Sequence, residues 1–122
     1  MNIHIKTKNI ELTQELRSLI NEKIGLLEKF IPSKPDQVIL AEVEVGKETE
    51  HHIHGDDLYR AEINLSFNKK MLRTVSLKSD INSALDEAKN EMQIRVTSYS
   101  NKVVDLMRRG ARKAKKMLRF RN

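Results

Sequence analysis

The sequence predicts an α+β fold: a β-α-β-β-β-α two-layer sandwich in which two helices cover one face of a four-stranded mixed sheet. Two stretches, VILAEVEV and YRAEINLSF, alternate apolar and polar residues at the two-residue period of strands. Two longer stretches, after Thr13 and after Asp80, repeat apolar residues at helical spacing. One sheet face and one stripe on each helix are therefore apolar, and packing both helices on that face buries all three surfaces.

The first three expected elements are a strand, a helix and a strand. Residues 3–6 alternate apolar and polar side chains, which predicts a short strand. Thr13 is expected to cap a helix whose apolar spacing continues to Ile31, and Pro32 ends it. Residues 38–45 form the second strand. Because a helix joins these two strands, a right-handed crossover should make them parallel.

The remaining elements are a hairpin and a second helix. The third strand is expected to end at Phe67, and Asn68–Lys70 looks like a hairpin turn into a fourth strand that ends at Leu77. Strands joined by short connections should be antiparallel. Ser79 or Asp80 then caps the second helix.

The second helix has an apolar stripe that keeps one phase over 38 positions, from residue 81 to residue 118. An unbroken helix of that length would be about 57 Å long, which exceeds the width of this domain. The helix must therefore either project past the sheet or bend, and a bend is expected near Gly110. The stripe consists of Ile81, Leu85, Ala88, Met92, Val96, Tyr99, Val103, Leu106, Met107, Gly110, Ala114, Met117 and Leu118.

Charge is concentrated at the end of the sequence. The chain of 122 residues carries a net charge of +6, but residues 102–122 alone carry +8 and residues 1–101 carry −2. We therefore expect two parts: an α+β domain over residues 1–101 and a basic amphipathic extension of the second helix over residues 102–122. Such asymmetry indicates a polyanionic partner.

The cations of this extension gather on one helical face, opposite the apolar stripe. Arginine grips phosphate through two parallel hydrogen bonds, so this face is typical of a helix that follows phosphates. Two other interpretations are a solvated helix docked by its apolar side and a helix lying on a membrane surface. The membrane is disfavoured because Gly110, Ala111 and Ala114 leave little apolar area for lipid. The face consists of Arg108, Arg109, Arg112, Lys113, Lys115, Lys116 and Arg119.

Catalysis finds no support in the sequence, so we expect no enzyme activity, no cofactor and no small-molecule substrate. The chain has no cysteine, only four glycines and no glycine-rich phosphate loop. Glu42 and Glu44 share one strand face, where solvated carboxylates are far commoner than catalytic ones. No signal peptide and no apolar stretch of membrane-spanning length is present, which indicates a soluble cytoplasmic protein.

Three histidines and two aspartates lie close together between the second and third strands. They lack the spacing of a preorganised metal site, so we expect an exposed loop and no metal. Zinc that stayed bound through dialysis would overturn this. The residues are His51, His52, His54, Asp56 and Asp57.

The outward face of the third strand carries Arg60, Glu62, Asn64 and Ser66. It offers no aromatic ring on which an RNA base could stack, so reading of single-stranded sequence is disfavoured. Contact with structured RNA through shape and phosphate is favoured.

The chain resembles the ribosome hibernation promoting factors, also called ribosome-associated inhibitors or ribosomal subunit interface proteins. MNIHIKTKNIELTQELRSLINEKIGLLEKF is similar to the family's opening strand and first helix, and YRAEINLSFNKKMLRTVSLKSDINSALDEAKNEM to its hairpin and second helix. The resemblance implies a fold similar to double-stranded-RNA-binding domains. It also implies binding to the small ribosomal subunit at the mRNA channel and the A and P sites, which silences translation by steric occlusion. The chain resembles the short type, without the domain that pairs ribosomes.

The sequence departs from the family pattern along the second helix. Asn82 stands where tyrosine is usual, and four positions that are often basic hold Glu91, Ile94, Ser98 and Ser100. Ile94 is expected to be exposed. The residues from Arg108 onward should therefore carry more of the phosphate contact than in the family. The expected rRNA-binding residues are Lys89, Arg95, Lys102, Arg108, Arg109, Arg112, Lys113, Lys115, Lys116 and Arg119.

The resemblance implies the small subunit, its rRNA and ribosomal proteins near the decoding site as partners, and we expect a monomer off the ribosome. Two alternatives stay open. The chain could be a general module for structured RNA, used in ribosome assembly or tRNA binding, or an adaptor whose basic amphipathic helix binds a protein or a membrane.

Overall fold

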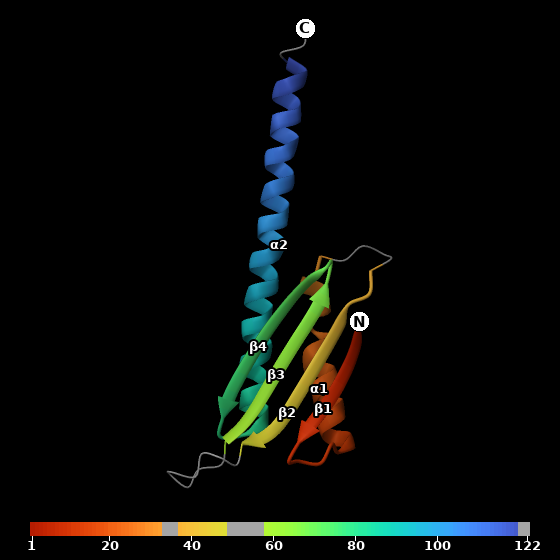
Figure 1. Cartoon of the computed structure of the whole chain (residues 1–122), viewed down its shortest axis with the longest axis vertical. Coiled ribbons are helices and arrows are strands. Elements are labelled where there is room, and N and C mark those ends of the chain that lie inside the picture. Colours follow the sequence, from red (N-terminus) through yellow and green to blue (C-terminus); the bar gives the residue numbers. More distant parts are fainter. Residues whose placement is uncertain (33–36, 49–57, 120–122) are drawn as a thin grey trace.

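The structure is a computed structural model that describes residues 1–32, 37–48 and 58–119, with side chains described up to Lys113. Its elements follow the predicted order, β-α-β-β-β-α, with one short 3-10 helix added (Figure 1). They are β1 (Asn2–Lys8), α1 (Gln14–Gly25), the 3-10 helix η1 (Glu28–Phe30), β2 (Leu40–Glu48), β3 (Leu58–Phe67), β4 (Lys70–Lys78) and α2 (Ile81–Arg119).

The four strands form one sheet in the order β1-β2-β3-β4. β1 and β2 are parallel, as expected of strands joined through a helix, and the other two pairs are antiparallel. Both helices lie on the same face of this sheet (Figure 1). The predicted two-layer α+β architecture is confirmed.

The hairpin between β3 and β4 closes through a two-residue turn. Asn68 and Lys69 have φ values of 50° and 61°, the left-handed conformation that tight hairpin turns require at both central positions. Asparagine adopts this conformation readily, whereas lysine does so at some cost. Asn68 Nδ2 also donates a hydrogen bond of 2.8 Å to the carbonyl oxygen of Pro32, which holds the turn against the segment after η1.

The first helix starts as predicted and ends earlier. Thr13 Oγ1 accepts a hydrogen bond of 3.1 Å from the backbone N–H of Leu16, which is the expected N-cap. The prediction that the helix continues to Ile31 is wrong, because α1 ends at Gly25 and the chain tightens into η1. Leu27 and Ile31 are nevertheless buried, since the tighter turn still directs them to the core.

The core lies between the sheet and the two helices. Both faces assigned from the sequence are buried: Ala41, Val43 and Val45 on β2, and Ala61, Ile63, Leu65 and Phe67 on β3. From the helices come Ile20, Ile24, Leu85, Ala88, Met92 and Val96.

Two buried hydroxyls join β4 to α2. Thr74 Oγ1 donates a hydrogen bond of 2.8 Å to the carbonyl oxygen of Ala88, and Ser76 Oγ donates to the carboxylate of Glu87. A buried hydroxyl without a partner is costly, so these bonds fix how the helix lies on the strand. They set the direction in which α2 leaves the body.

Candidate nucleic-acid interface

Helix α2 is anchored in the body over its first five turns. Asp80 caps it, because the carboxylate accepts hydrogen bonds of 2.8 Å from both the backbone N–H and the hydroxyl of Ser83. The backbone bond first, and then the hydroxyl bond, lower the pKa of Asp80. The hydroxyl of Ser76, and after it Lys78, lower the pKa of Glu87. Both carboxylates are thus kept charged where the helix is attached.

Tyr99 and Ser100 attach α2 to the body near the end of the sheet. The Tyr99 ring meets the Phe67 ring edge to face, with 5.4 Å between centroids. Ser100 Oγ donates a hydrogen bond of 3.4 Å to the carbonyl oxygen of Phe30. Ser100 is one of the positions that the family pattern often fills with a basic residue, and here it attaches the helix to the body.

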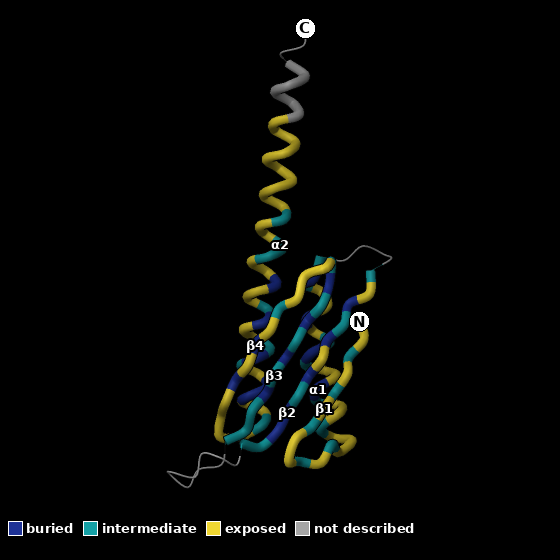
Figure 2. Tube along the Cα trace, in the orientation of Figure 1, coloured by how far each residue is buried: buried dark blue, intermediate teal, exposed yellow. Residues whose placement is uncertain are grey.

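Beyond Ser100 the helix continues without interruption and projects past the end of the sheet (Figure 1). Gly110 lies within the helix, and a Cβ added there would meet nothing within 4 Å. Of the two alternatives left by the sequence, projection is therefore the one found, and the bend near Gly110 is not. Figure 2 shows the helix changing from a mixture of buried, intermediate and exposed residues beside the sheet to mostly exposed residues along this segment.

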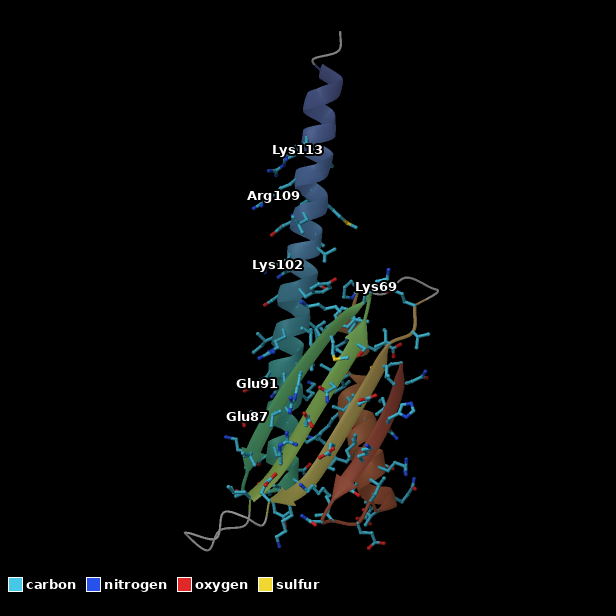
Figure 3. The ribbon with its side chains drawn as sticks, viewed as in Figure 1. Lys69, Glu87, Glu91, Lys102, Arg109 and Lys113 are labelled. Atoms are coloured by element: carbon cyan, nitrogen blue, oxygen red, sulfur yellow. The ribbon has the colours of Figure 1, made fainter. Side chains whose placement is uncertain are left out.

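Five of the predicted cations lie on the described part of this projecting segment and are all exposed. None of them forms an ion pair with another described residue. Figure 3 shows Lys102, Arg109 and Lys113 extending from the same side of the helix. Free cations on a protruding rod meet phosphates without first breaking an internal contact. We call these residues the distal cations: Lys102, Arg108, Arg109, Arg112 and Lys113.

The other predicted residues lie elsewhere. Lys89 is half-buried beside the body, where Nζ donates a hydrogen bond of 3.2 Å to Gln93 Oε1. Arg95 is exposed about one and two-thirds turns further along. Lys115, Lys116 and Arg119 belong to the helix, but their side chains lie outside the described part. Binding of RNA by any of these residues stays a prediction.

The outer side of α2 changes character along its length. Glu87 and Glu91 lie on the part beside the sheet, and Lys102, Arg109 and Lys113 lie on the part beyond it (Figure 3). Ile94 is 66% exposed, as expected. That anion contact begins near Lys102 and not at the helix start stays a prediction from the sequence.

Three lysines that the sequence did not single out surround the point where α2 leaves the body. Lys70 Nζ lies 5.8 Å from the centroid of the Tyr99 ring, and Lys29 Nζ lies 5.1 Å from that of Phe30. Lys69 stands at the hairpin tip, at the same end of the sheet (Figure 3). No local pattern connects these residues, because only the fold brings η1, the hairpin and α2 together.

The outer face of the sheet is polar and internally paired. Arg73 forms an ion pair with Glu62, and Arg60 Nη1 lies 3.4 Å from Glu62 Oε2 and 3.9 Å from Glu44 Oε1. In the described strands no Phe, Tyr or Trp faces outward, because Tyr59 and Phe67 share the inward face with Ala61. This face offers no platform for stacking bases.

The predicted histidine-rich loop, His51 to Asp57, lies outside the described residues. Elsewhere in the described part, no three His, Asp or Glu side chains come close enough to hold a metal ion. None of the helices there is both long and apolar enough to cross a membrane.

Comparison with known proteins gives a consistent result. A family profile described as Sigma 54 modulation protein / S30EA ribosomal protein matches residues 3–104. The ribosome hibernation promotion factor of Bacillus subtilis is 27% identical over 103 residues, which cover 84% of this chain and 50% of that protein. The chain thus spans about half the length of this curated relative.

Two solved structures share the fold. The N-terminal domain of protein Y from Thermus thermophilus superposes with a TM-score of 0.67 at 22% identity, covering 81% of this chain and 99% of that one. A ribosomal subunit interface protein from Coxiella burnetii gives a TM-score of 0.65 at 12% identity, covering 83% and 99%. The family match ends at residue 104, so every distal cation except Lys102 lies beyond it.

Proposed function

Because this chain belongs to the Sigma 54 modulation protein / S30EA ribosomal protein family, we propose that it is a ribosome hibernation factor. It binds the small ribosomal subunit in the mRNA and tRNA channel and silences translation by occupying the A and P sites. The observation that carries this proposal is the row of exposed, unpaired cations on a helix that projects from a body of the family's fold.

The two parts of the chain have different tasks in this proposal. Residues 1–101 form the domain that fills the channel, and residues 102–122 form a basic extension that follows rRNA phosphates and reaches neighbouring ribosomal proteins. Each phosphate neutralised by Lys or Arg releases condensed counterions, and this release drives binding. The lysines around the helix root, Lys29, Lys69 and Lys70, add positive charge where the two parts meet.

Occlusion needs shape and charge but no bond making or breaking, so no reaction is assigned to the chain. A ribosome partner places the protein in the cytoplasm.

A second candidate is a general module for structured RNA. It is favoured by one observation: the family match ends before Arg108, so the strongest positive charge lies in a segment that the family profile does not cover. Such a module would bind rRNA or tRNA by phosphate contact, without preference for the decoding channel.

Competition on purified small subunits separates these candidates. The chain should co-sediment with small subunits and be displaced by bound mRNA together with A- and P-site tRNA, because all of them occupy one space. An oligonucleotide of equal charge that does not enter the channel is the matched control. Binding that persists on subunits filled with mRNA and tRNA would defeat occlusion and favour the general module.

A further inference from the structure

The apolar stripe of α2 continues onto the projecting segment, where Val103 is half-buried and the described residues beyond it are exposed. Met92 and Val96 are buried against the sheet, whereas Leu106 is 64% and Met107 68% exposed at the same helical phase. Exposed apolar side chains that continue a buried stripe are typical of a surface that meets a partner. We call Val103, Leu106, Met107 and Gly110 the distal stripe.

The opposite end of the molecule carries an open apolar groove of about 460 Å³, between the starts of α1 and α2. Several large apolar side chains stand only partly buried there, so the core leaves part of their surface uncovered. We call this space the basal groove, and its apolar lining is Ile10, Leu16, Leu19 and Ile81.

Charge in the basal groove has one sign. Glu11, Glu15 and Asp80 line it together with Thr13 and Tyr59, and no Lys or Arg does. All three carboxylates are exposed. The groove is therefore suited to an apolar segment that has cations along its border.

The distal stripe is such a segment. Lys102 and Lys113 stand within about 100° of its centre on the helix, so they border the stripe on one side. Both are exposed, and neither forms an ion pair in the described structure. The two lysines lie about 16 Å apart along the helix, so a helix seated by its stripe would bring at least one of these ammonium groups toward the acidic border of the groove.

The two surfaces of one chain cannot meet each other. Val103 follows Ile81 by 22 residues in an uninterrupted helix, which separates them by about 33 Å. We propose that the distal stripe of one copy docks in the basal groove of a second copy. The contact is head to tail, because it joins two different surfaces.

Direct pairing of two projecting helices is the competing arrangement. It would place two segments of net charge +8 side by side, whereas docking in the groove joins opposite charges. This inference departs from the monomer expected from the sequence, where the groove could not be seen. Docking engages Lys102 and Lys113, which the proposed function assigns to rRNA, so RNA and the second copy compete for them.

Sedimentation velocity of the full chain, freed of nucleic acid, tests the proposal. At about 50 mM salt the chain should self-associate as concentration rises, and at about 500 mM, where exposed charges are screened, it should not. Lys102→Glu/Lys113→Glu and Glu11→Lys/Glu15→Lys should each weaken association by about tenfold or more. Glu22→Lys/Glu91→Lys changes exposed residues outside the groove by the same charge as the second variant and should leave association unchanged.

The decisive experiment mixes the helix variant with the groove variant and measures whether association returns. The groove variant keeps an intact helix, and the helix variant keeps an intact groove. A one-to-one mixture should therefore form a dimer, and association should stop at two copies. This recovery also shows that both variants fold. Association that survives the groove variant, a mixture that stays monomeric, or an intact chain that is monomeric at low salt would each overturn the proposal. None of these outcomes bears on binding to the small subunit, which is measured separately.

Discussion

At the scale of single residues, several cations of the body form ion pairs, whereas others there, such as Lys6 and Arg17, resemble the distal cations in forming none with a described residue. Arg60 and Arg73 are paired with acids on the sheet, and Lys23 with Asp86 between the helices. The distal cations have no such partner among the described residues. Binding a phosphate with them therefore costs no internal ion pair.

The triple change Arg108→Glu/Arg109→Glu/Arg112→Glu should weaken binding to small subunits by about 10²-fold or more, because three phosphate contacts become repulsions. Lys6→Glu/Lys8→Glu/Arg17→Glu, an equal charge change on the body, should have a far smaller effect. Filter binding at one fixed salt concentration measures both variants. Equal losses of affinity would show that net charge matters and the projecting helix does not.

A second residue-scale prediction concerns Gly46, where β1 and β2 approach each other closely. A Cβ at this position would lie 2.6 Å from the carbonyl oxygen of Lys8, which is backbone and cannot turn aside. Gly46→Ala should therefore lower the free energy of unfolding by about 1–3 kcal/mol. Gly25→Ala, where a Cβ meets nothing within 4 Å, should be neutral or stabilising. Urea denaturation compares them, and equal stability of the two variants would contradict this reading.

Residues whose roles depend on neighbours in the sequence were predictable, and those whose roles depend on the fold were not. The caps at Thr13 and Asp80 follow from residue type beside a periodic stretch. Gly46 carries no signal of its own, because the reason for glycine there is a strand 38 residues away. The lysines at the helix root are scattered in sequence for the same reason.

At the scale of elements, α2 has two halves. The first half packs on the sheet, and the second half projects beyond it. An isolated helix of some twenty residues is marginal in water, because starting it is costly. Here the anchored half supplies the start, and each further residue adds its own hydrogen bond. The anchored half therefore nucleates the helix and so stabilises the helical conformation of the projecting half.

Removal of residues 107–122 should leave the body intact while reducing rRNA binding. In the described part of α2 the last buried residue is Val96, and the attachments at Tyr99 and Ser100 also precede the cut, so the thermal unfolding midpoint should not change. Affinity for small subunits should fall by about 10³-fold, since most of the unpaired cations are lost. Circular dichroism and co-sedimentation measure the two quantities. A truncated chain that silenced ribosomes at full strength would refute the role given to the extension.

The spacing of apolar residues predicts which segments are helical, but it does not fix where a helix ends. The apolar spacing continued through Ile31, but α1 gives way to η1, because a tighter turn can keep the same side chains in the core. In α2 the spacing predicted one helix correctly. It could not decide between projection and bending, since that depends on where the sheet ends.

At the scale of the whole molecule, the body carries −2 and the extension +8. A charge held at one end orients the molecule in the field of a polyanion before contact. If six or more phosphates are neutralised, affinity should fall by about 10³-fold between 50 and 200 mM salt. Titrations across that range measure the slope, and the chain without residues 107–122 is the control, with a flatter line. An equally flat response of the full chain would contradict the estimate.

The uninterrupted passage of α2 from core to tip has a consequence for how the chain can change in length. A rod fixed at one end sets both the reach and the rotation of whatever it carries. One inserted residue between Ser100 and Arg108 would turn the tip by about 100° and advance it by only about 1.5 Å. An insertion of seven residues would nearly restore the original rotation of the tip about the helix axis and would lengthen the helix by about 10 Å. Two-turn steps are thus the natural increments by which such a protein could lengthen or shorten.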